Sequence, residues 1–308
     1  MTKTFLGLAF AALVVTVTAA GRAEPADPSA GCAGCHATIA AEWEGSSHHR
    51  SATNDAYVAQ LAREPLPFCR GCHAPRADAA RPTPAAIAEK GIGCVDCHAG
   101  LVIDHARGGA PKARACEGCH EFAFPRGPGL MQKTASEHRA SAYGATACAS
   151  CHLPSRDGHR DHRFDVEPLV AKAIVVDVTR AGPNRLAFRL APGAVGHAFP
   201  TGDLFRRLAV RVRSPDGARV AERFLGREFV STTLADGTRT RTEVRDERVG
   251  AGLAPCFELA APSGAASVEI ALERVHEPST RGHEVVVRSR TIAWQGVISA
   301  DAKEQSCR

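Results

Sequence analysis

Apolar and polar positions change their spacing near residue 164. Beyond that point, three stretches alternate apolar with polar or small residues, at 185–190, 208–213 and 267–273. Their apolar members are Leu186, Phe188 and Leu190; Leu208, Val210 and Val212; and Val268, Ile270 and Leu272. A period of two is typical of strands with one buried face, and the SPDG sequence after the second stretch predicts a turn. Short strands separated by turn signals predict an antiparallel β-sandwich over residues 165–308.

The part before residue 164 predicts short helices joined by loops rich in proline and glycine. One candidate helix covers residues 38–43, and a second runs from Asp55 to Ala62 with Asn54 as its cap. A third begins at Thr83–Pro84, a cap followed by a first-turn proline, and stops at Gly91. The expected fold class is therefore α+β, with a mostly helical and loop-rich N-terminal domain preceding the sandwich.

The first 23 residues have the pattern of a secretory signal peptide. Lys3 precedes the apolar run from Phe5 to Val17, and small residues follow it, so cleavage is expected between Ala20 and Ala23. An uncleaved membrane anchor is the alternative, but the run is short for a membrane span. We expect a periplasmic or extracellular protein without a stable membrane span after cleavage.

One motif, Cys-x-x-Cys-His, occurs five times. The copies are Cys32/Cys35/His36, Cys69/Cys72/His73, Cys94/Cys97/His98, Cys116/Cys119/His120 and Cys148/Cys151/His152. Two cysteines at this spacing can each form a thioether with a haem vinyl group, and the adjoining histidine can bind the iron. Zinc knuckles and disulfide frameworks are the alternatives, but neither explains a histidine behind every pair. The sequence predicts five covalently bound haem c groups.

These motifs suggest how the chain is organised. All five lie between residues 32 and 152, which leaves roughly 24 residues per haem, too few for a conventional apolar core. The porphyrins are expected to serve as the core, in agreement with an aromatic content of only 5%. The predicted divisions are a signal peptide at 1–23, a pentahaem domain at 24–164 and a β-sandwich at 165–308.

The second axial ligand of each iron must come from histidines outside the motifs. Of the 14 histidines, nine remain: His48, His49, His105, His138, His159, His162, His197, His276 and His283. The stretches SSHHRSA and SEHRASA align and pair His48 with His138, both on predicted helices. His105 follows His98 by seven residues, and His162 follows His152 by ten, with His159 as a closer rival. A solvated or propionate-bonding histidine is the alternative for each of these, and His276 and His283 are expected to be surface residues.

His197 lies in the β-half, in the loop GHAFPTGD. The haem-binding half supplies four distal candidates for five irons, so we expect His197 to provide the fifth ligand. Gly196 would allow close approach of the backbone to a porphyrin, and Pro200 would stiffen the turn. In the competing interpretation, His197 is a loop residue and His159 and His162 serve different haems.

Two cysteines, Cys256 and Cys307, lie outside the motifs. In an oxidising compartment they could pair and tie the C-terminal tail to the sheet, and two separate buried thiols are the alternative. Closing a loop of that size contributes roughly 4 kcal/mol in the chain-entropy description.

The first motif, followed by Trp43, Ser46 and His48, resembles the opening of the tetrahaem cytochromes that accept electrons from hydroxylamine oxidoreductase, and of their wider multihaem relatives. The segment from Cys151 to Phe164 is similar to one that recurs in those relatives, and GHAFPTGD resembles a loop of larger multihaem cytochromes with a β-domain. The resemblance implies stacked and perpendicular haem pairs, bis-histidine ligation and electron transfer. Five motifs and a C-terminal sandwich depart from the tetrahaem pattern, so the partner enzyme is not carried over.

Three functions compete. The first is an electron carrier that exchanges electrons with redox partner proteins through mostly bis-histidine haems. The second is a reductase of a small nitrogen or sulfur oxyanion at one open haem. Pentahaem nitrite reductases carry Cys-x-x-Cys-Lys at the catalytic haem, however, whereas every motif here ends in histidine. The third is a subunit of a conducting filament or surface complex, in which an exposed sheet edge makes a homo-oligomer.

Charge does not point to nucleic acid. The formal net charge is +5 before haem is counted, and each haem adds two propionates. Arginine and lysine side chains near the motifs are therefore expected to pair with propionates. No basic tract accompanies them, so no nucleic-acid partner is expected.

Overall fold

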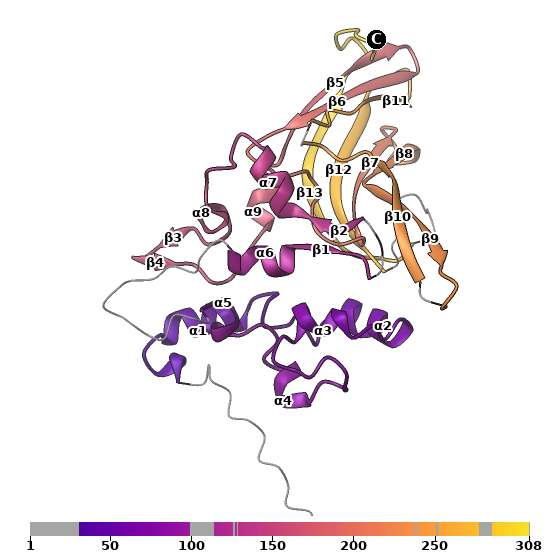
Figure 1. The fold of residues 1–308 in the computed structure, drawn as a ribbon. Coiled ribbons are helices and arrows are strands. Elements are labelled where there is room, and N and C mark those ends of the chain that lie inside the picture. Colours follow the sequence, from indigo (N-terminus) through magenta and orange to yellow (C-terminus); the bar gives the residue numbers. More distant parts are fainter. Residues whose placement is uncertain are drawn as a thin grey trace, which may run out of the picture.

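The computed structural model describes residues 31–98, 114–125, 127, 129–237, 239–250, 252–276 and 285–307. Short helices and loops form the N-terminal part, and antiparallel sheets form the C-terminal part, which confirms the α+β class (Figure 1). Within these ranges, no helix is both long and apolar enough to cross a membrane. The predicted signal peptide, His105 and His283 lie outside the described residues.

Every helix in the described ranges is short. They are η1 (Cys32–Gly34), α1 (Ala37–Glu44), α2 (Asp55–Arg63), α3 (Phe68–His73), α4 (Ala85–Ala88), α5 (Cys94–His98), α6 (Arg114–His120), α7 (Thr134–Ala140), α8 (Cys148–His152) and α9 (Glu167–Val170). The first two predicted α-helices are confirmed, and the side chain of Asn54 accepts a hydrogen bond of 3.0 Å from the backbone N–H of Tyr57.

Two local predictions need correction. The third predicted helix is only one turn long, because the chain stays extended at Pro84, which is the cap rather than the first helical residue. His48 was expected on a helix, but it lies in a series of turns that follows α1. A turn can direct the His48 ring inward without burying a whole helical face, so this correction leaves its ligand prediction open.

Two sheets form the β-half. One has the strand order β13-β12-β7-β8, and the other has the order β11-β6-β5. Their strands are β5 (Ile174–Gly182), β6 (Arg185–Pro192), β7 (Arg206–Arg213), β8 (Arg219–Leu225), β11 (Cys256–Ala260), β12 (Ala266–Val275) and β13 (Val287–Ile298). Two-stranded sheets are made by β1 (Glu121–Ala123) with β2 (Leu130–Lys133), β3 (Ser155–Arg156) with β4 (His159–Arg160), and β9 (Arg227–Thr233) with β10 (Arg239–Asp246).

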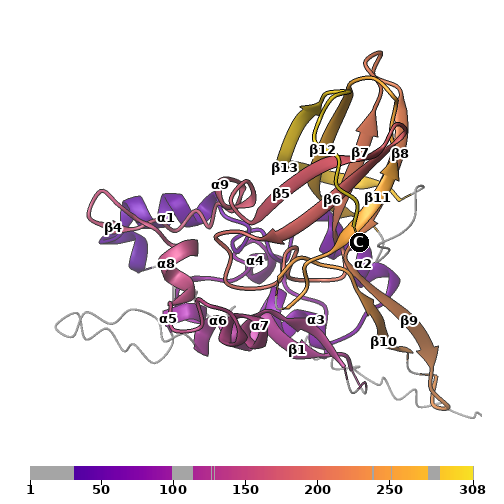
Figure 2. The same ribbon diagram turned by 90° about the horizontal axis from the view of Figure 1, so that it is seen from above.

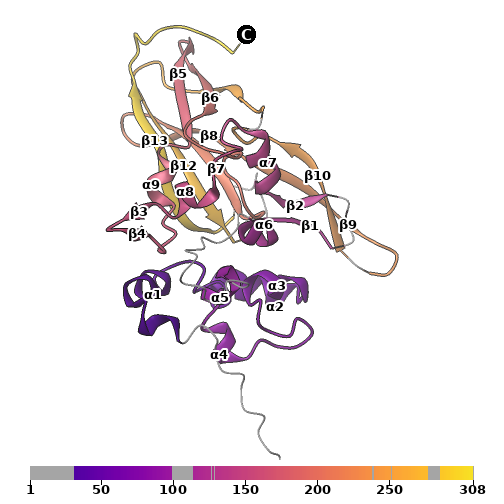
Figure 3. The same cartoon turned by 60° about the vertical axis from the view of Figure 1, so that its left-hand side comes forward.

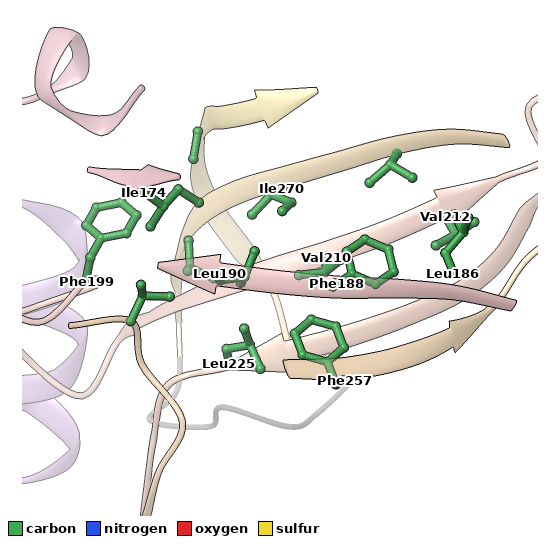
Figure 4. Close-up of a cluster of buried hydrophobic side chains, with 14 of the residues drawn as sticks. Ile174, Leu186, Phe188, Leu190, Phe199, Val210, Val212, Leu225, Phe257 and Ile270 are labelled. Carbon is green, nitrogen blue, oxygen red and sulfur yellow. The ribbon is translucent and has the colours of Figure 1, made fainter. Parts of the chain in front are cut away.

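The alternating residues pack between the two larger sheets. Phe188 of β6 and Val210 of β7 are fully buried, and both belong to one apolar cluster with Phe257 of β11 and Ile270 of β12 (Figure 4). Because side chains of a strand alternate between its two faces, the inward set can fill this space. The predicted strands and their inward apolar residues are confirmed. The prediction of a single buried face is wrong for β7 and β12, where the ion pair of Arg207 and Glu273 at 2.9 Å is buried on the opposite face.

The C-terminal tail is fastened to the smaller sheet. Cys256, the first residue of β11, forms a disulfide with Cys307, 51 residues further along the chain. Thr179 and Arg189 add hydrogen bonds from β5 and β6 to the carbonyl oxygens of Gln305 and Ser306. The expected pairing of the two non-motif cysteines is confirmed.

The motif-bearing helices lie at one end of the sandwich. In Figures 1 and 3, α6 lies between the layer of α1 to α5 and the larger sheets. Figure 2 shows the hairpin of β9 and β10 projecting away from those helices. Polar contacts join α7 to the β-half, so the motif-bearing part and the sandwich share a specific interface.

Candidate haem sites

Four of the five motifs form a short helical segment that ends at the motif histidine. These segments are α3, α5 and α8, together with the last five residues of α6. On a helix, residues three apart share one face, so both thiols and the imidazole of each motif can approach one side of a flat group.

The first motif differs from the other four in conformation. Cys32 begins the 3₁₀-helix η1, and Cys35 follows its end, with its backbone N–H donating a hydrogen bond of 3.2 Å to the carbonyl oxygen of Cys32. Cys35 and His36 are exposed, and so are Cys116 and His120 of the fourth motif. The 3₁₀-helix η1 packs against α1, the next element of the chain. The expected packing of all five motifs around porphyrins and thioether formation by Cys35 stay predictions.

Exposure also varies among the other motif cysteines. Cys116 and Cys151 are exposed, whereas the remaining seven thiols, including that of Cys32, are partly buried. Each exposed cysteine shares its motif with a partly buried one. An exposed thiol is accessible to a haem vinyl group, so this pattern is compatible with attachment at all five motifs.

Three motif histidines face a histidine from a distant part of the chain. The ring centres of His48 and His120 are 6.3 Å apart, those of His98 and His162 are 6.4 Å apart, and those of His152 and His197 are 6.2 Å apart. Each pair brings together a proximal candidate and a predicted distal candidate.

These separations suit one iron atom between the two rings. A metal–imidazole bond of about 2.0–2.1 Å on each side, with about 1 Å from each ring centre to its nitrogen, spans roughly 6 Å. Rings in direct stacking contact lie closer, as Tyr57 and His73 do at 4.1 Å. The three pairs therefore fit haem iron with two imidazole ligands.

Hydrogen bonds at Nδ1 leave the other ring nitrogen for a metal. Nδ1 lies 2.7 Å from the Arg160 carbonyl oxygen in His162, and 3.0 Å from the Ala198 carbonyl oxygen in His197. In His73 it lies 2.7 Å from the carbonyl oxygen of Ser51. A carbonyl only accepts, so Nδ1 donates and the lone pair of the neutral ring stays on Nε2, as an iron ligand requires.

Burial keeps these imidazoles neutral. It lowers the pKa of His48, His73, His98 and His152, and it lowers the pKa of His120 and His197 to about 4. Neighbouring imidazoles act in the same direction at most of these sites. Histidine binds metal in its neutral form, so at pH 7 these rings are in the state that can hold iron.

Glu42 distinguishes the two rival histidines His159 and His162. One carboxylate oxygen of Glu42 lies 3.0 Å from Nε2 of His159, and the other accepts the backbone N–H of His162 at 2.9 Å. The hydrogen bond and charge of Glu42 raise the pKa of His159. Glu42 thus binds Nε2 of His159, the nitrogen that would bind iron. It also holds the backbone of His162, whose ring faces that of His98.

His138 is engaged differently from the other predicted ligands. Its Nδ1 lies 2.9 Å from the carbonyl oxygen of Gly196, and its Nε2 lies 2.7 Å from that of Thr146. In this arrangement His138 links α7 to the His197 loop and to the residues before the fifth motif. Binding iron would require Nε2 to leave Thr146, so the ligand role of His138 stays a prediction.

Gly196 allows close approach of the His138 side chain, and its approach to a porphyrin stays a prediction. A Cβ atom on Gly196 would lie 2.7 Å from Nδ1 of His138, closer than van der Waals contact permits. The expectation that a glycine is required beside His197 therefore has a physical basis. The group it accommodates is a side chain of α7.

A buried charge cluster fixes α7 against the His197 loop. Glu137 forms an ion pair with Arg248, and it accepts hydrogen bonds from the Ala198 N–H at 3.3 Å and the Thr201 hydroxyl at 3.2 Å. Arg248 also binds Asp246 at 2.7 Å. Burial would raise the pKa of Asp246, but the hydrogen bonds and charge of Arg248 outweigh it and lower the pKa to about 2. Sequence patterns gave no signal for this cluster, because its members are far apart in the chain.

A second polar chain runs from a motif histidine to the same loop. The amide nitrogen of Gln132 lies 2.9 Å from Nδ1 of His120 and 3.3 Å from the hydroxyl oxygen of Thr134. Thr134 lies 2.8 Å from the hydroxyl of Thr201. The fourth motif and the loop that carries His197 are thus connected by side-chain hydrogen bonds.

Cysteines of different motifs also interact. The thiol of Cys119 raises the pKa of Cys72, and that of Cys148 adds to the rise of the pKa of Cys116 that burial causes. Helix α5 packs against α6. The fourth motif, on α6, therefore adjoins the second, third and fifth motifs.

Comparison with known proteins identifies one part of the chain. Residues 31–99, which contain the first three motifs, match the family described as cytochrome c554 and c-prime. The matched part is less than a quarter of the 308 residues. It supports a c-type cytochrome with covalently bound haem and a role in electron transfer. Neither the curated proteins nor the solved structures gave a match.

Proposed function

We propose that this chain is an exported multihaem cytochrome that carries electrons along five covalently bound haems. The observation that carries the proposal is the set of three histidine pairs at 6.2–6.4 Å, each with one member in a Cys-x-x-Cys-His motif. Haem iron supplies the chemistry, because it accepts and returns one electron. The protein supplies thioether bonds through the ten motif cysteines, all of which are free of disulfides in the structure.

The paired imidazoles favour a carrier over a reductase. His48, His162 and His197 would close the distal face of the sites of His120, His98 and His152, leaving no position for a substrate at those irons. A six-coordinate iron rearranges little when its charge changes, which suits electron transfer. Burial lowers the pKa of His48, His98, His120, His152 and His197, which keeps these rings neutral.

Contacts between the motifs support a continuous path. Each thioether sulfur would be joined to the edge of its porphyrin through one carbon of the former vinyl group, so interacting cysteines would bring two porphyrin edges near each other. The interactions of Cys72 with Cys119 and of Cys116 with Cys148 join the second and fifth motifs to the fourth. Packing of α5 on α6 adds the third motif. We infer that the haem on α6 is a junction with three neighbours, so electrons can enter and leave by different branches toward redox partner proteins.

Haem content is tested by intact mass. Five attached haems should add roughly 3.1 kDa to the processed polypeptide, at about 0.62 kDa each. A variant with both Cys148 and Cys151 replaced by Ala should lose one haem increment, and so should a variant with both Cys32 and Cys35 replaced by Ala. An increment of four or fewer haems in the fully matured wild-type protein would contradict the proposal.

The ligand role of His197 is tested by substitution. His197→Ala should open one iron, which would turn high-spin or take a new ligand and would bind carbon monoxide when reduced. His276→Ala, at another histidine of the β-half, is the matched control and should leave the spectra unchanged. If His197→Ala has the wild-type Soret band and binds no carbon monoxide, His197 is not a ligand.

A further inference from the structure

Arg206, the first residue of β7, places its guanidinium over the loop that carries His197. Its Nη1 donates a hydrogen bond of 3.3 Å to the carbonyl oxygen of Thr201. Gly202 lies beneath the guanidinium, and a Cβ atom there would be 3.2 Å from the central carbon of Arg206. Gly202 also has a φ of +107°, a backbone conformation that side chains other than glycine rarely adopt.

One donor of Arg206 has no partner. The side chain is 32% exposed overall, but its Nε atom is buried and makes no hydrogen bond in the structure. Asp203 is the nearest acidic group, and its carboxylate oxygen is 4.0 Å from Nε, beyond hydrogen-bonding distance. A buried donor on a cation is costly to leave unpaired, so this position calls for an acceptor that carries negative charge.

The surroundings of Arg206 are the histidines of two haem sites. Thr201, which accepts the hydrogen bond from Arg206, lies four residues after His197, whose ring faces that of His152. The hydroxyl of Thr201 also lies 2.8 Å from that of Thr134, which Gln132 links to His120. The guanidinium therefore lies beside the sites of the fourth and fifth motifs. Each haem brings two propionate carboxylates, which have the negative charge and the acceptor oxygens that this position lacks.

We propose that Arg206 binds a propionate carboxylate at these two haem sites and raises the reduction potentials of both irons. This inference rests on the haem-binding function proposed above. Reduction removes one positive charge from the iron, so a nearby cation favours the reduced form. Loss of Arg206 should lower the reduction potentials of both irons, because it removes a cation and leaves the propionate charge uncompensated.

The test is an EPR-monitored redox titration of the holoprotein carrying Arg206→Gln. The iron between His48 and His120 and the iron between His152 and His197 should both titrate at more negative potentials than in the wild type. Arg206→Lys keeps the charge without the planar fork and should shift both by less. Arg213→Gln, at the other end of β7, is the matched control and should leave all potentials unchanged.

Unchanged potentials in Arg206→Gln with five haems bound would overturn the proposal. If that variant does not take up its haems, Arg206→Lys decides, because a lysine ammonium cannot reproduce the planar fork and should still lower the same two potentials by a smaller amount. Wild-type potentials in Arg206→Lys with five haems bound would then reject the role. Failure of the haem-binding function itself would be seen in the wild-type protein, as missing haem mass or open irons, before any variant is compared.

Discussion

Single residues decide which histidines can reach iron. Backbone carbonyls hold Nδ1 of His162 and His197, whereas the ring of His159 is taken by Glu42. Two histidines three positions apart thus acquire different roles from one carboxylate. The ring of His49 packs on Trp43, and its Nδ1 lies 2.8 Å from the carbonyl oxygen of Glu44.

A pair of substitutions tests this distinction. His162→Ala should remove one ligand of the iron at His98, so that one haem binds carbon monoxide after reduction. His159→Ala should leave the visible spectrum and the carbon monoxide response of the wild type, because its ring is bonded to Glu42. Opposite results for the two variants would reverse the assignment.

Residue spacing predicted some parts of this site and could not predict others. The motif cysteines and histidines are contiguous, so local chemistry was enough to find them, although it gave no sign that Cys35 would be exposed. The partners of the His48, His162 and His197 rings are set by packing between segments up to 72 residues apart, as for His48 and His120. Local sequence also gave no signal for Gln132, Glu137, Arg206 or Arg248, whose roles depend on contacts across the two halves.

The helices that carry the motifs are too short to be stable by themselves. Segments of five to seven residues, such as α5 and α6, lie well below the roughly 12–15 residues at which an isolated helix becomes marginal in water. Thioether and iron bonds would fix them instead. The sandwich strands, by contrast, are stabilised by an apolar core made of their own alternating residues. Hydrophobic periodicity therefore predicted these strands well and the third helix less well.

The disulfide gives an element-scale prediction. Replacing both Cys256 and Cys307 by Ser should lower the free energy of unfolding of the β-half by up to about 4 kcal/mol, because the unfolded chain regains the freedom that the crosslink removes. Denaturant unfolding followed by far-ultraviolet circular dichroism would measure this loss. The wild type, denatured without reductant, should react with no alkylating agent at these positions, and labelling of both would contradict the crosslink.

At the scale of the whole molecule, the three histidine pairs connect overlapping stretches of chain. His48 with His120, His98 with His162 and His152 with His197 together span most of the described sequence, and the last pair joins the two halves. The buried pair of Glu137 and Arg248 reinforces the same junction. Haem binding and packing of the sandwich onto the motif helices are therefore expected to depend on each other.

Low-temperature EPR of the oxidised holoprotein, with spin quantitation, tests this account most directly. At least three irons per chain should be low-spin. The near-perpendicular rings of His48 and His120, at 77°, should give a strongly anisotropic signal, whereas the pairs at 25° and 13° should give rhombic signals. Three or more high-spin irons per chain would contradict the proposed ligation and the electron-carrier function that depends on it.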